Sequence, residues 1–231
     1  MLPLRDLHSQ LDEALNINSV ESVFTDLYYT DLINEQRSLW IRNEYNKNRS
    51  IDPYLQQTIG DLEMELVDPV ACCEGIPGFC KILRSKVQVP NTIEFFFSKG
   101  LTSVGPVDIT QKRFTLIDYA RVPYVGHGRT TKKTIYTFLY NQYLYVISDD
   151  PIVKSLKYIN VRGIFEDPTA IGDFCTCTGT PCWSPSDIYP INLWMWAYIK
   201  PIIVQMLMQK RANTLDDGNN AKDDTSVDGR Q

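Results

Sequence analysis

Six cysteines are the residues of this sequence best suited to binding a metal. They fall into two groups about 100 residues apart: Cys72, Cys73 and Cys80, then Cys175, Cys177 and Cys182. If the two groups met in space, their thiolates could hold a structural zinc ion. Neither group has the C-x-x-C spacing of zinc ribbons, and no histidine lies near either. The first ten residues contain charges where a signal peptide needs an apolar run, so we expect reduced, free cysteines and no bound metal.

The sequence lacks the common catalytic signatures. It contains no nucleotide-binding glycine pattern, no G-x-x-x-x-G-K-S/T, no H-E-x-x-H and no G-x-S-x-G. Of its two histidines, His8 falls in a predicted helical stripe, so a cysteine–histidine nucleophile pair would have to use His127. No feature of the sequence indicates which cysteine would join it. We therefore expect a protein that is not an enzyme and that needs no cofactor.

A short basic segment, VGHGRTTKK at 125–133, is the best candidate for binding an anion. Its glycines permit a tight turn around His127, and Arg129, Lys132 and Lys133 place three positive charges between two predicted strands. Such a loop could contact nucleic acid phosphates without reading the base sequence. Two alternatives remain open, a solvated hairpin tip, which residue types alone favour, and contact with an acidic protein surface.

Charge is segregated along the chain although its net charge is only −5. Residues 1–70 hold 5 basic and 13 acidic residues, residues 71–211 hold 16 and 10, and residues 212–231 hold 2 and 5. An acidic first third and a basic middle can attract copies of the chain head to tail, the geometry that closes rings. The alternative, that the charges only solvate separate faces, is favoured for any one segment.

The elements that must position these residues begin with helices. Apolar residues recur at three- and four-residue spacing behind Pro3, a second helix is predicted to start at residues 18–19, and Asp52 with Pro53 is typical of the start of a third. The buried stripe of the third helix would be formed by Leu55, Ile59, Leu62 and Leu66. Residues 1–70 are therefore predicted to belong to a helical bundle.

From residue 71 onward the pattern predicts strands. Residues that are β-branched or aromatic concentrate in five segments separated by proline, glycine and aspartate: 80–89, 92–97, 113–124, 133–148 and 158–165. Asn141 and Gln142 are predicted to form a hairpin turn inside the fourth segment. We expect a β-rich domain over 71–187.

The run IYPINLWMWAYIKPIIVQMLM, residues 188–208, has Lys200 as its only formal charge. A membrane span is disfavoured, because Pro201 would kink it and a single span offers no partner helix for its polar side chains. The favoured interpretation is a core helix over 188–211. Its apolar residues form two faces, so it needs burial on two sides, one against the helical bundle and one against a neighbouring subunit.

These patterns together predict an α+β fold. It would consist of an N-terminal helical bundle over 1–70, a β-rich domain over 71–187 and a long C-terminal helix over 188–211 that packs back on the bundle. The polar, acidic residues 212–231 are predicted to form a flexible tail.

The order of these parts resembles that of the head-to-tail connector proteins of tailed bacteriophages, and more narrowly the neck ring or adaptor proteins of crAss-like phages. The resemblance covers about residues 1–211. It is carried by the Cys-Cys…Cys-Lys-Ile-Leu-Arg-Ser-Lys-Val run within 72–90, by KYINVRGIFEDP at 157–168 and by SDIYPINLWMWAYIKPIIVQMLMQK at 186–210.

The resemblance implies a structural, non-enzymatic virion protein that is assembled in the host cytoplasm. Proteins of that family form rings, commonly twelve-fold, beneath the portal, extend the DNA channel and provide the seat for tail components. The implied partners are further copies of the chain, the portal protein, adjacent neck or tail proteins, and double-stranded DNA in transient, non-specific contact. No membrane partner is implied.

The family does not identify the residues that make these contacts. From residue types we expect Arg129, Lys132 and Lys133 to face the DNA channel or a partner protein. The residues expected at the subunit contact are Trp194, Trp196, Ile203 and Leu207. The alternative function is a zinc-stabilised cytosolic nucleic-acid-binding domain, in which the two cysteine groups would share the metal.

Overall fold

The computed structural model describes residues 2–15, 24–48, 52–67, 82–96, 100–108, 110–125, 131, 133–148, 153–174 and 179–223. The chain divides into two compact units. The first, which we call the helical unit, comprises residues 1–41 and 185–231, and the second, which we call the sheet unit, comprises residues 42–184.

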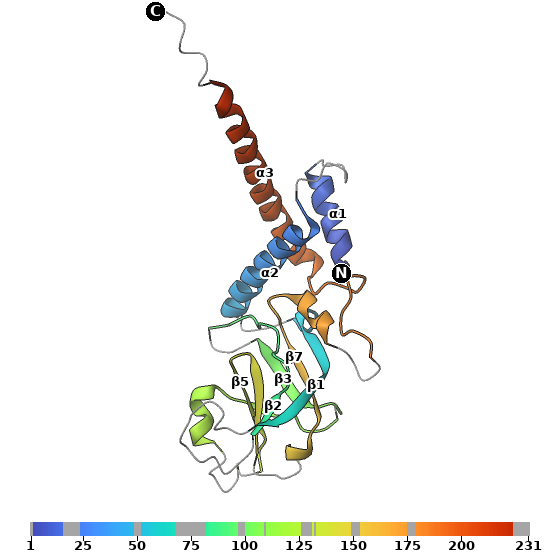
Figure 1. Ribbon diagram of the computed structural model, residues 1–231, viewed down its shortest axis with the longest axis vertical. Coiled ribbons are helices and arrows are strands. Elements are labelled where there is room, and N and C mark those ends of the chain that lie inside the picture. The colour runs from blue at the N-terminus through green and yellow to red at the C-terminus, as the bar shows by residue number, and fades with distance from the viewer. Residues whose placement is uncertain are drawn as a thin grey trace, which may run out of the picture. The chain divides into compact units, whose positions relative to one another are not determined.

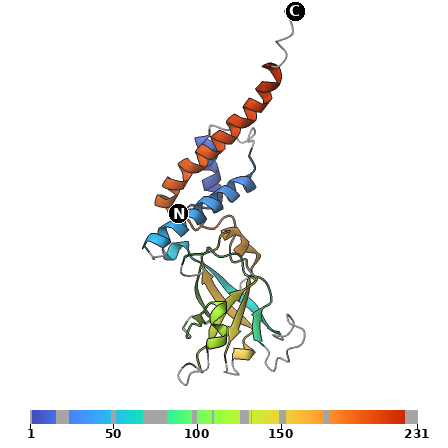
Figure 2. The same cartoon turned by 90° about the vertical axis from the view of Figure 1, so that its left-hand side faces the viewer.

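The sheet unit is built on seven strands. In chain order they are β1 (Gln57–Val67), β2 (Ile82–Ser85), β3 (Leu101–Pro106), β4 (Thr115–Leu116), β5 (Tyr136–Tyr140), β6 (Tyr143–Ile147) and β7 (Tyr158–Gly163). Their order in the sheet is β3-β7-β1-β2-β6-β5-β4. Every neighbouring pair is antiparallel except β4 and β5, which are parallel, so the sheet is mixed. Figures 1 and 2 show its strong curvature from two sides.

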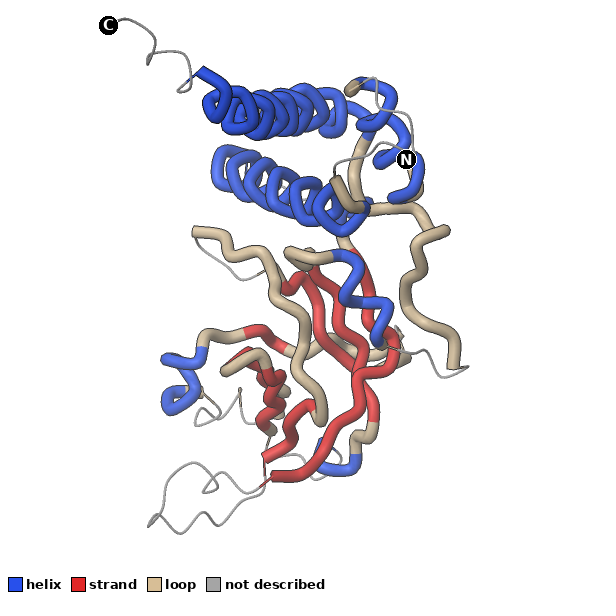
Figure 3. Tube along the Cα trace, turned by 45° about the horizontal axis from the view of Figure 1, so that its top comes forward, coloured by secondary structure: helices blue, strands red, loops and turns tan. Residues whose placement is uncertain are grey.

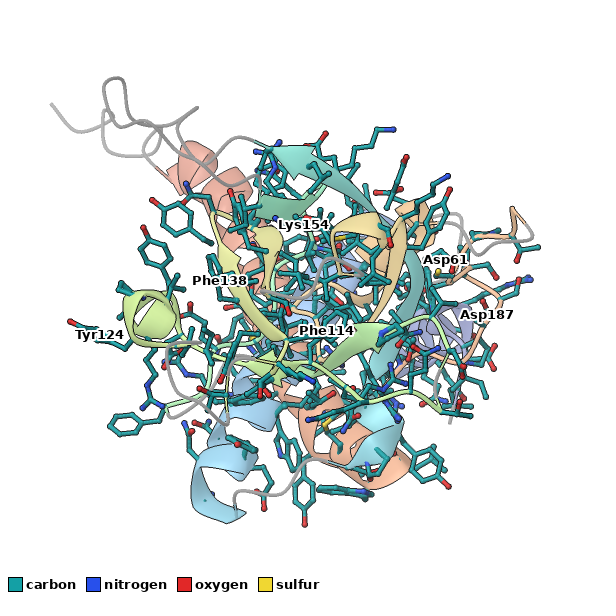
Figure 4. All side chains as sticks on the ribbon, turned by 90° about the horizontal axis from the view of Figure 1, so that it is seen from below. Asp61, Phe114, Tyr124, Phe138, Lys154 and Asp187 are labelled. Carbon is teal, nitrogen blue, oxygen red and sulfur yellow. The ribbon has the colours of Figure 1, made fainter. Side chains whose placement is uncertain are left out.

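The curvature brings the two ends of the sheet together. The amide of Phe114, just before β4, donates to the carbonyl of Val104 in β3 over 2.8 Å, although these strands stand at opposite ends of the sheet order. The sheet is therefore nearly closed into a barrel, which leaves few unpaired strand edges. Seen from below, the strands surround a filled centre (Figure 4). Ile59, Leu62 and Val104 are among the fully buried side chains of this core.

Strand β1 is the longest strand, and it corrects the predicted fold. Residues 57–67 were expected to lie in a helix because Ile59, Leu62 and Leu66 follow helical spacing. Instead β1 pairs with β7 and β2, and the register shifts between Ile59 and Leu62. A bulge adds one residue to a strand, so two residues three apart in the sequence both point into the core. Ile59 and Leu62 are accordingly both fully buried.

The predicted fold class, an α+β fold with an N-terminal helical bundle over 1–70 and a long C-terminal helix packing back on it, is therefore wrong. The fold is β-rich, a seven-stranded mixed sheet nearly closed into a barrel, with few helices. The Asp52 and Pro53 signal does start a helical turn, but only the 3-10 turn η1 (Pro53–Leu55). The Asp52 carboxylate accepts from the amide of Tyr54 there, over 3.0 Å.

Other local signals act as predicted. Asn141 and Gln142 join β5 to β6, and their φ angles of 49° and 63° place both residues in the left-handed region that a two-residue hairpin turn requires. This confirms the predicted hairpin. The other 3-10 helices among the described residues of the sheet unit are η3 (Tyr119–Tyr124), η4 (Val153–Ser155) and η5 (Pro168–Asp173).

Gly100 lies where the chain enters β3, and the close approach of backbone there gives a stability prediction. A Cβ at this position would come within 2.8 Å of the carbonyl oxygens of Ile93 and Ile164. We expect Gly100→Ala to lower the free energy of unfolding by about 1–3 kcal/mol in urea denaturation, because neither oxygen belongs to a movable side chain. Gly60→Ala is the matched control, since nothing lies within 4 Å of its Cβ position. Equal stability of the two variants would contradict the prediction.

The helical unit contains α1 (Leu4–Ala14), the greater part of α2 (Asp26–Asn48) and α3 (Leu193–Asp223). The segment before α3 runs beside the N-terminus. The amide of Tyr189 donates to the carbonyl of Leu2 over 3.1 Å, and Pro3 and Ile188 form an isolated antiparallel β-bridge. Leu7, Leu11 and Ile33 are fully buried in this unit.

Candidate subunit interface

One side of α3 is buried inside the helical unit. Its buried residues recur at four-residue spacing, Met195, Ile199, Ile203 and Leu207, and each is at most 1% exposed. Spacing of this kind places side chains in one row along a helix. This row is therefore the side of α3 that packs against the rest of its own chain.

Contacts at both ends of this row hold α3 against α1 and α2. The indole of Trp196 donates to the amide oxygen of Gln10 in α1 over 2.7 Å. Trp194 meets the ring of Trp40 edge-on with centroids 4.7 Å apart, and the ammonium of Lys210 lies 4.0 Å from the ring of Tyr28. The first turn of α3 meets the later part of α2, and Lys210, further along α3, meets the first turn of α2. The two helices are therefore antiparallel neighbours (Figure 3).

A buried arginine fixes the segment that leads into α3. Arg37 of α2 is fully buried, and its Nε donates to the carbonyl oxygen of Pro190 over 2.8 Å. Its guanidinium also lies 5.9 Å from the ring centroid of Tyr189, whose hydroxyl donates to the side chain of Asn34. A charge-assisted bond of this kind sets the position of the chain three residues before α3 begins.

A neighbouring side of α3 is apolar and exposed. We define the outer stripe of α3 as six residues whose exposed fractions lie between 37% and 65%: Leu193, Trp194, Tyr198, Ile202, Met206 and Met208. Pro201 lies among them and is also exposed. Proline has no backbone N–H, so one hydrogen bond of the helix is absent at this position. Contiguous apolar surface of this extent is typical of a site that contacts another protein.

His8 of α1 is a half-buried titratable side chain of the helical unit. Its Nε2 lies 3.2 Å from the hydroxyl of Thr30 and its Nδ1 lies 3.8 Å from the carboxylate of Asp26. Burial lowers the pKa of His8 below its ordinary value, although the carboxylates of Asp26 and Asp12 act in the opposite direction. The unfolded chain therefore binds a proton here more readily than the folded chain.

The direction of the pKa shift predicts loss of stability on acidification. The stabilising contribution of neutral His8 is complete above the unfolded pKa of about 6.5 and is lost as the pH falls below it. We expect the thermal midpoint of the wild-type chain to fall between pH 7.5 and pH 5.5, and the fall to be smaller in His8→Gln. Identical pH dependence in the two proteins would exclude this role of His8.

The residues predicted at the subunit contact are divided between the two sides of α3. Trp194 is exposed and belongs to the outer stripe, whereas Trp196, Ile203 and Leu207 are buried in their own chain at 4%, 0% and 0% exposure. Contact of any of the four residues with a neighbouring chain stays a prediction. Tyr198, Ile202 and Met206 were not singled out from the sequence. Their four-residue spacing from Trp194 is the signal that groups them.

The predicted basic loop, and the cysteines weighed as metal ligands, lie mostly outside the described residues. Of Arg129, Lys132 and Lys133, only Lys133 is described, and it is exposed. His127 is outside, as are five cysteines: Cys72, Cys73, Cys80, Cys175 and Cys177. Cys182 is half-buried and its thiol is free. Its backbone amide donates to the carbonyl of Phe174 over 2.7 Å. In the part of the chain that the structure describes, no three metal-binding side chains lie together.

A second exposed surface lies on the outside of the sheet unit, where tyrosines gather over β5, β6 and η3. Tyr119 stacks on Tyr140 with centroids 4.4 Å apart, and the Arg84 guanidinium lies 4.6 Å from the Tyr143 ring. Tyr124 points away from the sheet (Figure 4) and is 83% exposed. We call these residues the tyrosine patch. Tyrosine and arginine are the residue types enriched at protein interfaces.

Among the described helices, including α3, none is both long enough and apolar enough to cross a membrane.

Comparison with known proteins identifies the family. The family of phage tail ring protein 2 matches residues 12–225 of the chain. The chain is also similar to Ring protein 2 of Bacteroides phage crAss001, with 27% identity over 225 residues that cover 94% of this chain and 95% of the relative. These matches confirm the resemblance to ring proteins of crAss-like phages. Because the family match extends over nearly the whole sequence, the chain belongs to the phage tail ring protein 2 family.

Proposed function

We propose that this structural virion protein forms a ring in the head-to-tail connector, or neck, below the portal. In this role each ring extends the DNA channel and attaches tail components, and the chain acts by geometry rather than by catalysis. The ring contains several copies of the chain, twelve in the arrangement that the resemblance implies. Its site of action is the neck of the virion, after assembly in the host cytoplasm.

The outer stripe of α3 is the observation that carries this proposal. A ring needs a surface on each subunit that is more stable when covered, and burial of apolar side chains contributes about 25 cal/mol for each Å² removed from water. The six residues of the stripe are large and exposed while the other side of the same helix is buried. Membership of a ring protein family supports a further copy of the chain as the molecule that covers them.

The basic loop suits the wall of a DNA channel. Translocating DNA requires contacts that are weak, replaceable and independent of sequence, because tight base-specific binding would stall it. Isolated cations on a loop make contacts of that kind. We therefore propose that Arg129, Lys132 and Lys133 face DNA or an adjoining protein.

The tyrosine patch suits a neighbouring protein of the connector. Tyr119 and Tyr140 hold each other in place by stacking, so little side-chain entropy of these two rings is lost when a partner covers them. We propose the portal protein or an adjacent neck or tail protein as that partner.

Mass photometry of the full-length chain tests the ring, first alone and then with the portal protein of the same phage. We expect a discrete species of many copies in at least one condition, and a mass on portal that corresponds to a whole number of chains. A chain that stays monomeric in both conditions contradicts the proposed function.

A further inference from the structure

The outer stripe of α3 requires a complementary surface on the adjacent copy, and the exposed side of α2 has the properties of one. Four residues at four-residue spacing lie in a row on this side, Leu27, Asp31, Glu35 and Leu39, and all are exposed. We call this row the α2 face. It is separate from the side of α2 that its own chain covers, where Tyr29 and Ile33 are fully buried. The α2 face thus has an apolar residue at each end and carboxylates between them.

The two helices that carry these surfaces differ in charge. Between Leu193 and Arg211 helix α3 contains three basic residues, Lys200, Lys210 and Arg211, and no acidic residue. Between Asp26 and Ile41 helix α2 contains three acidic residues, and its one basic residue, Arg37, is fully buried. Exposed charge pairs add little affinity, but they decide which surfaces pair and at what rate. A basic, apolar helix therefore prefers the α2 face to a second copy of itself.

Ring geometry excludes the symmetric pairings. If α3 packed on α3, or α2 on α2, the contact would be isologous and complete with two copies, and it would also bring like charges together. If α3 of one copy packs on α2 of the next, the row of copies has an unused outer stripe at one end and an unused α2 face at the other. Such heterologous contacts extend from copy to copy and close into a ring when the rotation allows.

We infer that the outer stripe of α3 docks on the α2 face of the adjacent copy, and that this heterologous contact builds the ring. The inference rests on the proposed function, because it names the contact by which the ring forms. It requires two different surfaces on every subunit, so two different variants must each abolish assembly.

Two blocked variants of the full-length chain test the inference. In the first, Tyr198→Asp and Ile202→Asp block the outer stripe of α3. In the second, Asp31→Lys, Glu35→Lys and Leu39→Lys block the α2 face. All five side chains are exposed, so each variant is expected to melt as a folded protein in circular dichroism. Sedimentation velocity at tens of micromolar then compares each variant, their equimolar mixture and the wild-type chain.

The expected result is two monomers that form a dimer, and nothing larger, when they are mixed. Each blocked variant still carries the surface that the other lacks, so one contact forms and growth stops there. Assembly of the second variant to the wild-type mass would overturn the inference while leaving the ring itself in place. A mixture that stays monomeric would overturn it too, and a wild-type chain that never assembles, alone or with portal, would remove the proposed function with it.

A milder variant covers the case in which reversed charges disturb the fold. Asp31→Asn with Glu35→Gln keeps the shapes of the side chains and removes their charge. We expect its dissociation constant to be several-fold weaker than that of the wild-type chain at 50 mM NaCl, with the difference vanishing at 500 mM NaCl because salt screens exposed pairs. Equal dissociation constants at low salt would contradict the pairing of α3 with the α2 face.

Discussion

A chain that carries Tyr198→Asp and Ile202→Asp is expected to fold like the wild-type protein and to remain monomeric where the wild-type protein assembles. Both side chains are exposed in the single chain, at 65% and 46%, so their replacement removes little from its core. In a covered contact, each aspartate would be buried without a partner, at a cost of about 2 kcal/mol or more. Two such changes weaken each subunit contact by about a thousandfold. Mass photometry measures the assembly, and a circular dichroism melt measures the fold.

The matched control places the same changes elsewhere. Tyr54→Asp and Val87→Asp replace an aromatic and a β-branched residue of the sheet unit, which are 68% and 48% exposed. They add the same charge as the α3 variant, and we expect assembly to be unchanged. If the control also abolished assembly, added charge would explain both results. If the α3 variant assembled normally, the outer stripe would not be a subunit contact.

How far the sequence predicts this fold is clearest in β1. Its apolar residues at 59, 62 and 66 have the spacing of a helix, and a local reading assigns a helix. The spacing arises instead from a bulge between Ile59 and Leu62, which moves both side chains to the same face of a strand. Pairing with β7 and β2 overrides local periodicity here, and those partners lie far away in the sequence. The hairpin at Asn141 and Gln142, by contrast, depends only on neighbouring residues, so the sequence was sufficient to predict it.

The subunit contact on α3 stays a prediction, and the sequence did not show which side chains of that helix are exposed. The sequence indicates that α3 is apolar on two sides, yet nothing local distinguishes the side that its own chain buries. Long-range contacts make that choice, such as the hydrogen bond from Trp196 to Gln10 and the edge-on contact of Trp194 with Trp40. They bury Trp196, Ile203 and Leu207 and leave Tyr198 and Ile202 exposed. A pattern of apolar residues fixes the period of a helix, whereas the rest of the fold fixes its rotation.

The second large effect is expected at Arg37. Its side chain is fully buried, and its Nε donates to the carbonyl oxygen of Pro190. In Arg37→Met this buried carbonyl would lose a charge-assisted bond, which costs about 1.5–3 kcal/mol, and the contact with the Tyr189 ring would be lost as well. We expect the free energy of unfolding of the full-length chain to fall by about 2–4 kcal/mol in urea denaturation. Arg37→Lys keeps the charge without the planar guanidinium, so we expect an intermediate loss.

Arg5→Met is the control for Arg37→Met, because Arg5 lies exposed on α1 and its loss should change stability by less than about 0.5 kcal/mol. Both measurements belong in the Tyr198→Asp, Ile202→Asp background, where subunit association does not add to the stability of the folded chain. In the wild-type background Arg37→Met should also weaken assembly, since Pro190 lies three residues before α3 and a displaced start of that helix would misplace the outer stripe. If Arg37→Met were as stable as Arg5→Met, the segment before α3 would be positioned by other contacts, and the subunit surface would not depend on the buried arginine.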